Sequence, residues 1–213
     1  MTWFIAALGS SIGKKLMMAL TGLAFIGFLA AHLAGNLLLI AGREAFNGYA
    51  EKLQSLGPIL QVFRAGLIGF ALVHILTGLY LFLQNRRARP ERYEMDASAG
   101  GRTISSRTMP YTGLIILGFL IFHLFHFTWT EKGARTIFDL VAAAFNQPWA
   151  ILLYAAAMIV VALHVRHGFW SAFQSVGASH PKTMPAVTAL SWAAGGLVAF
   201  GFGLLPFFML IRY

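Results

Sequence analysis

The sequence contains no cysteine in its 213 residues. Without thiols, the chain cannot form disulfides, ligate an iron–sulfur cluster or attach haem covalently through a C-x-x-C-H motif. Any metal ion that it binds must be held by histidine, methionine or oxygen ligands. The seven histidines are therefore the residues whose role most needs an explanation.

Charged residues are also scarce, at 11% of the chain, whereas hydrophobic residues make up 58%. A typical soluble domain has about 25% charged residues. Five stretches contain no aspartate, glutamate, lysine or arginine: 16–42, 65–85, 108–130, 140–165 and 183–211. Each is long enough to cross a hydrocarbon layer of about 30 Å, which takes about 20 helical residues. The chain is therefore predicted to lie in a lipid bilayer.

The predicted fold is all-α, an integral membrane bundle of five transmembrane helices that forms one domain over residues 1–213. The first charge-free stretch is longer than the apolar core of a cleavable signal peptide, so we include it in the bundle. We expect helices near residues 14–41, 58–85, 108–131, 147–173 and 183–211.

The net charge of +9 comes from basic residues that gather on one side of the predicted membrane. If the helices alternate in direction, 10 of the 16 lysines and arginines share that side: Lys14, Lys15, Arg86, Arg87, Arg89, Arg92, Arg102, Arg107, Arg166 and Lys182. Basic residues favour the cytoplasmic side of membrane proteins. We therefore expect a cytoplasmic N-terminus and an external C-terminus, and we attribute the charge to topology rather than to nucleic-acid binding.

Two pairs of predicted helices resemble each other. Residues 21–33, TGLAFIGFLAAHL, match residues 112–124, TGLIILGFLIFHL, at eight positions, one of which aligns His32 with His123. The second helices of the two pairs also correspond, because in each a histidine follows a proline by 16 residues and precedes a glycine by four. Duplication of a helix pair explains this pattern, and so does the similar composition of membrane helices.

The repeat predicts that four histidines lie at two depths. His32 lies about 16 residues from the inner end of its helix, or about 24 Å at 1.5 Å per residue, and His123 corresponds to it. His74 and His164 lie late in helices that start on the outside, which places them in the inner half. A polar ring in hydrocarbon is costly and marks a functional position.

Two histidines that face each other at one depth can hold a haem iron from both sides. Such bis-histidine ligation leaves no position for oxygen or substrate and suits electron transfer. A lone histidine in a membrane more often bonds to a neighbouring helix, but four at matched positions favour two haem sites. Six glycines would allow close approach of a porphyrin or of another helix: Gly22, Gly27, Gly78, Gly113, Gly118 and Gly168.

Two further histidines, His126 and His167, each follow a predicted ligand by three residues. The repeat places Gly35 and Thr77 at the corresponding positions, so neither histidine has a counterpart. We therefore assign the ligand role to the earlier histidine in each case. We expect the later ones to be interfacial residues or hydrogen-bond donors to haem propionates.

The following stretches carry a resemblance to a known family: AHLAGN at 31–36, EAFNGYAEKLQSL at 44–56, VHILTG at 73–78, TGLIILGFLIFHL at 112–124 and LHVRHGFWSAFQSVG at 163–177. In this order, and over nearly the whole chain, they resemble the five-helix, two-haem cytochrome b subunit of succinate:quinone oxidoreductases, which comprise succinate dehydrogenases and fumarate reductases. The resemblance implies that His74 and His164 ligate a proximal haem b near the cytoplasmic side. It implies that His32 and His123 ligate a distal haem b.

The resemblance also implies partners and a location. The complexes of this family contain a flavoprotein subunit with covalent FAD, where succinate and fumarate react, and an iron–sulfur subunit that docks on the basic inner face. Electrons pass between the iron–sulfur clusters, the two haems and a quinone, which is menaquinone or another quinone. The chain would work in a bacterial cytoplasmic membrane, in the tricarboxylic acid cycle or in anaerobic respiration, within a complex that is a candidate dimer.

The family implies a quinone site on the outer side, near the distal haem, where residues 43–57 connect the first two helices. Some members have an acidic residue where this chain has Gln54, and an amide cannot take the quinol protons. Glu51 or Glu44 would substitute, since a general base needs only hydrogen-bond reach. The alternative is that both acids are solvated residues of an interfacial loop. Some members also carry a glutamate where this chain has Ala162, so a buried carboxylate is absent there.

Haem propionates favour cationic partners, and the candidates are Lys15, Arg64, Arg166 and Lys182. Arg64 lies within the second predicted helix, where extension of its side chain to the membrane surface is the alternative. The polar segment 84–108 contains Pro90 and Gly100–Gly101 and is predicted to be a cytoplasmic loop. It would either contact the iron–sulfur subunit or only set the topology.

Two other functions fit the same residues. One is the cytochrome b anchor of a formate dehydrogenase or a hydrogenase, which copurifying subunits would distinguish. The other is a haem-free, proton-coupled transporter whose histidines relay protons, which bound haem would exclude.

Overall fold

The computed structural model describes residues 2–88, 104–131 and 133–213. Over these ranges the chain is helical and contains no strand. Five helical segments are long and apolar enough to cross a membrane: Ser11–Ala41, Pro58–Arg87, Ser105–Thr128, Pro148–Ser175 and Met184–Arg212. The prediction of an all-α fold with five helices long and apolar enough to span a membrane is confirmed over these ranges. Most of the predicted polar loop lies outside the described residues, including Arg89, Pro90, Arg92, Gly100, Gly101 and Arg102.

Three of the five spans are continuous α-helices, namely α2 (Ser11–Ala41), α4 (Pro58–Arg87) and α7 (Pro148–Ser175). The other two contain a π-helical segment. The third span is α5 (Ile104–His123) followed by η1 (Leu124–Thr128). The fifth consists of α8 (Met184–Gly196), η2 (Leu197–Phe202) and α9 (Leu205–Arg212). Short π-helical segments occur frequently at functional positions, and η1 begins directly after a predicted ligand.

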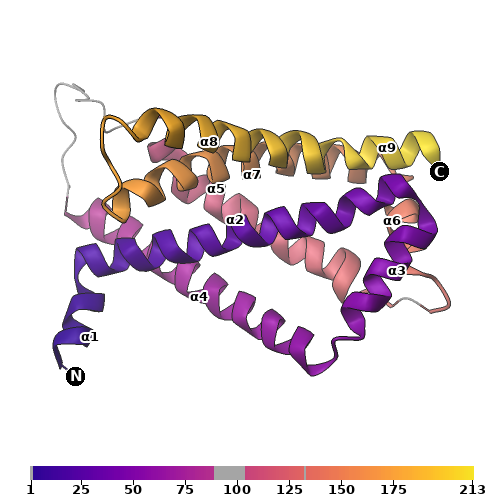
Figure 1. The fold of residues 1–213 in the computed structure, drawn as a ribbon, viewed down its shortest axis with the longest axis horizontal. Helices are drawn as coiled ribbons and strands as arrows, with labels where there is room; N and C mark the ends of the chain where they lie inside the picture. The colour runs from indigo at the N-terminus through magenta and orange to yellow at the C-terminus, as the bar shows by residue number, and fades with distance from the viewer. Residues whose placement is uncertain (1, 89–103, 132) are drawn as a thin grey trace.

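The spans alternate in direction, so the two ends of the bundle carry different short helices (Figure 1). Helix α1 (Thr2–Gly9) lies at one end, with the last turns of α4 and the start of α5. Helices α3 (Arg43–Gln54) and α6 (Ile137–Phe145) lie at the other end, with the C-terminus. The end with α1 is the one that carries the basic residues near the span boundaries.

Helix α7 is the central element of the bundle, because it packs against α2, α5 and α8. It contributes to both hydrophobic clusters that the described residues form. The cluster toward α3 and α6 is aromatic and includes Phe138 and Tyr154. The other cluster uses smaller side chains, such as Ala157, Val161 and Val165. Small residues allow the close helix approach on which packing in lipid depends.

Helix α4 is one of two spans that bury few of their residues within the described part of the chain. Leu81 is the only one of its residues, all of which the structure describes, that is buried within the chain. Large apolar side chains are exposed along its length, among them Ile59, Phe63, Ile68 and Leu76. In Figure 1, α4 diverges from α2 toward the end that carries α3. Such an apolar surface is suited to contact with lipid, a cofactor or another subunit.

The connection between the first two spans is mainly a helix rather than a loop. Helix α3 is flanked by Gly42 and Gly57, whose φ angles of 104° and 52° are readily adopted only by glycine. The helix packs on α2 where Tyr49 covers Gly35, since a Cβ atom on Gly35 would lie 2.6 Å from Tyr49 Cε1. The acids predicted for a quinone site are therefore held on an ordered helix.

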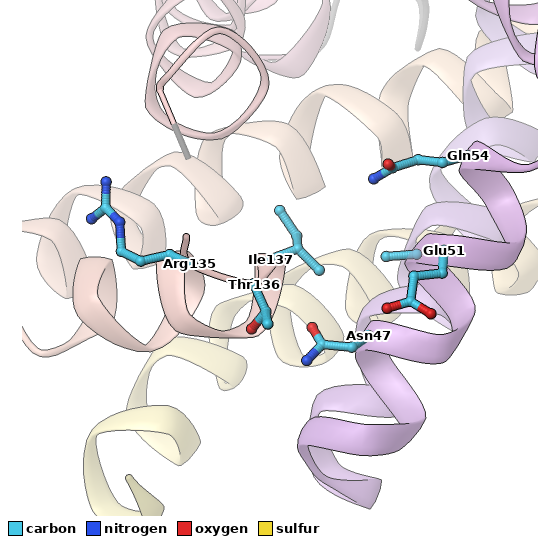
Figure 2. Close-up of a pocket in the computed structure, with 7 residues that line it drawn as sticks. Asn47, Glu51, Gln54, Arg135, Thr136 and Ile137 are labelled. Carbon is cyan, nitrogen blue, oxygen red and sulfur yellow. The ribbon is translucent and has the colours of Figure 1, made fainter. Parts of the chain in front are cut away.

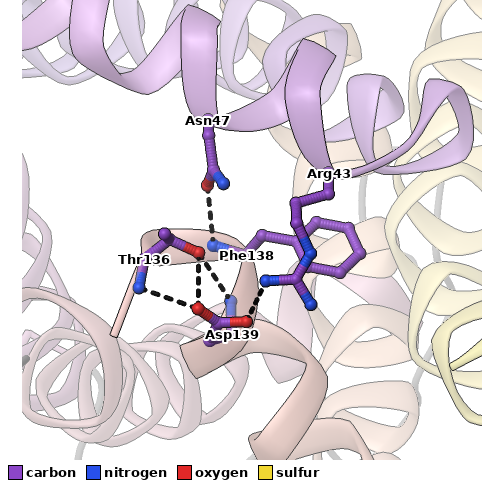
Figure 3. A network of polar contacts seen from close by, with 5 residues as sticks. All are labelled: Arg43, Asn47, Thr136, Phe138 and Asp139. Carbon is purple, nitrogen blue, oxygen red and sulfur yellow. Dashed lines mark hydrogen bonds and ion pairs between the residues drawn. The ribbon is translucent and has the colours of Figure 1, made fainter. Parts of the chain in front are cut away.

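Helices α3 and α6 are tied together beside a cavity that both line (Figure 2). Arg43 forms an ion pair with Asp139, and its guanidinium lies 4.8 Å from the centroid of the Phe138 ring. Asn47 Oδ1 accepts a hydrogen bond of 3.1 Å from the Phe138 amide (Figure 3). Thr136 and Asp139 form a capping box at the start of α6. The two short helices thus form one cap over this end of the bundle.

We expect Gly35→Ala to destabilise the packing of α3 on α2, because the added methyl group overlaps the Tyr49 ring. Overpacking of this kind costs about 1–3 kcal/mol. Thermal unfolding in detergent would show the loss as a lower midpoint temperature. Gly48→Ala is the control, since a Cβ atom there meets no described atom within 4 Å. Equal midpoints for the two variants would contradict this account of the packing.

Hydrogen bonds from Thr136 and from Arg43 lower the pKa of Asp139 from 3.8 to about 2. Because the folded-state pKa lies below the unfolded one, these contacts stabilise the fold above about pH 4, and the effect is lost as the pH falls toward 2. Thr136→Val and Arg43→Gln should each raise the Asp139 pKa, since each removes a side-chain hydrogen bond to the carboxylate. NMR titration of the carboxyl carbon measures both changes. An unaltered pKa in Thr136→Val would show that the cap is formed differently.

Candidate functional site

The structure brings the four matched histidines together in two pairs. In the proximal pair, His74 of α4 and His164 of α7 have ring centroids 6.5 Å apart and an angle of 65° between the ring planes. In the distal pair, His32 of α2 and His123 of α5 have ring centroids 6.0 Å apart and an angle of 81°. All four residues are half-buried. Each pair therefore joins two different spans inside the bundle.

Both spacings fit a metal ion between two imidazoles. A metal–nitrogen bond to imidazole is about 2.0–2.1 Å, and the ring centroid lies about 1.1 Å farther, so the centroids of opposed ligands are about 6.3 Å apart. Among the residues that the structure describes, no group of three or more histidines, aspartates or glutamates is placed to hold a metal ion. A pair of imidazoles suits a metal whose other ligands come from its cofactor, as the four porphyrin nitrogens of haem do.

Each histidine of the proximal pair is hydrogen-bonded to a threonine on the preceding span. Thr21 Oγ1 is 3.1 Å from His74 Nδ1, and Thr112 Oγ1 is 3.0 Å from His164 Nδ1. Both threonines lie 11 residues before the distal histidine of their own span. Since 11 helical residues extend about 16 Å, the two pairs occupy separate depths of the bundle.

The distal pair has different hydrogen-bond partners. Tyr154 Oη lies 3.2 Å from His123 Nδ1 and 3.2 Å from His126 Nδ1. Asn36 Nδ2 lies 3.4 Å from His32 Nδ1 and donates to the His32 carbonyl oxygen at 2.8 Å. His126 therefore shares a buried tyrosine hydroxyl with the predicted ligand, a contact that the sequence does not predict.

Two of the six glycines lie against the proximal rings. A Cβ atom on Gly22 would be 3.3 Å from His74 Cε1, and one on Gly113 would be 3.5 Å from His164 Cε1. Gly78 instead approaches a methionine of α2. The remaining three meet no described atom within 4 Å of a Cβ position: Gly27, Gly118 and Gly168. The glycines at 22 and 113 thus leave room for the imidazole rings.

Arg166 stands out among the four cations predicted to meet haem propionates. Its Nε is buried and has no hydrogen-bond partner in the part of the chain that the structure describes. Its guanidinium carbon lies 3.7 Å from the centroid of the Trp192 ring. The other three are exposed: Lys15, Arg64 and Lys182. A buried donor without a partner fits an anionic group such as a propionate.

A cavity of about 180 Å³ lies between α3 and the start of α6. Its lining includes Glu51, Gln54 and Arg135 (Figure 2). Glu44, the third residue predicted for a quinone site, is exposed on α3 and does not line the cavity. Helix α2 reaches this end of the bundle nine residues, or about 14 Å, after His32. The cavity is thus nearer to the distal pair than to the proximal pair.

Four residues at hydrogen-bond distance from the paired histidines are not predicted from the sequence: Thr21, Asn36, Thr112 and Tyr154. Thr21 and Thr112 occupy matching positions in the two halves of the repeat. A search for polar residues conserved between the halves would therefore have identified them. Tyr154 carries no such signal, because the corresponding residue of the first helix pair is Arg64. Its role follows only from the packing of α7 against α5.

Comparisons of the chain with protein-family models, with curated proteins and with solved structures give no match. Its function is therefore inferred from the paired histidines and from the sequence motifs.

Proposed function

We propose that the chain is the haem b-binding membrane anchor of a succinate dehydrogenase or fumarate reductase complex, where it passes electrons between an iron–sulfur subunit and membrane quinone. The observation that carries the proposal is the presence of two imidazole pairs, with ring centroids 6.0 and 6.5 Å apart, in a bundle of five apolar spans. Haem b held between two imidazoles supplies one-electron transfer and has no open position for oxygen.

The different depths of the two pairs support a role across the membrane. The proximal pair lies toward the end of the bundle that carries the basic residues Lys14, Lys15, Arg86 and Arg87. We assign this end to the cytoplasm of a bacterial cell and to the iron–sulfur subunit. The distal pair lies toward the cavity between α3 and α6. A separation of about 16 Å between the pairs then spans much of the hydrocarbon layer.

The succinate and fumarate chemistry is proposed from the sequence resemblance. In that family the dicarboxylates react at FAD on a flavoprotein subunit, so this chain would hold no dicarboxylate site. The cytochrome b anchor of a formate dehydrogenase or a hydrogenase is the alternative. Subunits that copurify with the chain distinguish these complexes, because the partner is a FAD protein in one case and a molybdenum or nickel protein in the other.

We place the quinone, menaquinone or another quinone, at the cavity between α3 and α6. Glu51 lines this cavity and is the residue that we propose to take the quinol protons. Gln54 offers an amide hydrogen bond in the same lining, and Arg135 contributes positive charge. Glu44 lies on the same helix but does not line the cavity, so substitution of Glu44 is a suitable control for substitution of Glu51.

Haem content tests the assignment of the ligands. We expect two b-type haems per chain in reduced-minus-oxidised spectra of the complex purified in mild detergent. His123→Ala should lose the distal haem and keep the proximal one, because it removes one of the two distal iron ligands. His126→Ala is the matched control, since it shares Tyr154 but not the ligand role, and it should keep both haems.

Absence of haem from a well-folded preparation would exclude the electron-transfer function. It would favour a haem-free, proton-coupled transporter, in which the contacts of Tyr154 with His123 and His126 would relay protons. Loss of a haem from His126→Ala, with both retained in His123→Ala, would move the ligand role to His126.

Quinone turnover tests the role of Glu51. Glu51→Gln should lower the rate of quinone-coupled turnover about 10²–10⁴-fold, which is the usual contribution of a general acid or base. Glu44→Gln should leave that rate almost unchanged. Reduction of a soluble dye by succinate should be normal in both variants, since that reaction takes place on the flavoprotein. Equal effects of the two substitutions would remove Glu51 from the proposed site.

A further inference from the structure

The hydrogen bonds of the proximal pair repeat in the two halves of the chain. The first span of each half supplies a Thr-Gly dipeptide, Thr21–Gly22 or Thr112–Gly113, and the second span supplies a histidine. In both halves the threonine hydroxyl lies at hydrogen-bond distance from Nδ1, and the glycine faces Cε1 of the same ring. One threonine and one glycine therefore flank each ring in the same way.

Each threonine hydroxyl has a single proton and a carbonyl oxygen of its own helix within hydrogen-bond distance. Thr21 Oγ1 donates to the Met17 carbonyl oxygen at 2.8 Å. Thr112 Oγ1 donates to the Met109 carbonyl oxygen at 3.0 Å. With its proton given to its own helix, each hydroxyl oxygen is left as an acceptor. In this arrangement the imidazole donates from Nδ1, which then carries the hydrogen.

We infer that Thr21 and Thr112 are positioning residues that fix His74 and His164 in the tautomer with hydrogen on Nδ1, so that the lone pair on Nε2 is free for the iron. This inference rests on the proposed haem function and deepens it. A hydrogen bond from the second ring nitrogen orients a metal-bound histidine and raises its basicity as a ligand. The glycine beside each threonine keeps the space that the oriented ring occupies.

The distal pair provides an internal reference. Its histidines meet Asn36 and Tyr154 instead of threonine hydroxyls. A change at Thr21 should therefore alter the proximal haem and leave the distal haem as it is. In one preparation, the proximal haem then measures the effect of the substitution and the distal haem serves as the control.

The test is potentiometric titration and haem quantitation of the purified complex that carries Thr21→Val. Valine keeps the shape of threonine without the hydroxyl. We expect the midpoint potential of the proximal haem to rise, because a less basic ligand stabilises the ferric iron less. We also expect the affinity for that haem to fall about 10–100-fold, as is usual when an outer hydrogen bond to a metal ligand is removed. The distal haem should titrate as in the wild type.

Three further variants complete the design. Thr21→Ser restores the hydroxyl and should restore the wild-type potential. Thr112→Val should act on the same haem from the opposite ligand, so that a folding defect in one variant still leaves a decisive measurement. Thr77→Val removes a hydroxyl one turn after His74 on the same helix and leaves the Thr21 contact intact, so it should change neither haem.

Wild-type potential and retention of the proximal haem in Thr21→Val and in Thr112→Val would overturn the inference while leaving the proposed haem function standing. An equal shift of both haems would also overturn it, because that pattern reports a general change of the bundle. A wild-type complex without haem would instead contradict the proposed function itself.

Discussion

An imidazole N–H placed in hydrocarbon needs a hydrogen-bond acceptor, because no water is present to supply one. This requirement links the spans of the bundle in specific pairs. Thr21 connects α2 to α4, Thr112 connects α5 to α7, and Tyr154 connects α7 back to α5. Hydrophobic contact alone does not select neighbours in lipid, since all apolar faces are equivalent there. The polar contacts give each helix a defined partner and a defined depth.

Close packing at small residues also holds the helices of the bundle together. A Cβ atom on Gly195 of α8 would lie 3.0 Å from the Ala162 carbonyl oxygen of α7, so the two helices approach until backbone meets backbone. Ala162 itself is buried within the chain. Leu33 of α2 presses on Gly201 in the π-segment of the last span. Small residues thus hold α2, α7 and α8 together as the inner part of the bundle.

The sequence was sufficient for the five spans, because the cost of placing charge in lipid leaves long charge-free runs that are easy to recognise. Matching the two halves also identified the histidines that the structure brings into pairs. Helix α3 was missed as a helix, since its polar composition and flanking glycines are equally typical of a surface connection. The contacts of Tyr154, and the Arg166 nitrogen that has no partner among the described residues, depend on how α7 meets α5 and α8. Such contacts between helices distant in sequence leave no pattern along a single chain.

The sparse packing of α4 has a consequence for how this protein is made. This helix supplies His74, yet Leu81 is its only residue, all of them described, that the rest of the chain buries. If haem b joins His74 to His164, the cofactor contributes much of the cohesion between α4 and the inner helices. The newly inserted chain would then hold α4 loosely until haem arrives. Haem binding would then have to precede the firm packing of α4. In a cell short of haem, the loosely packed bundle would be exposed to membrane proteases.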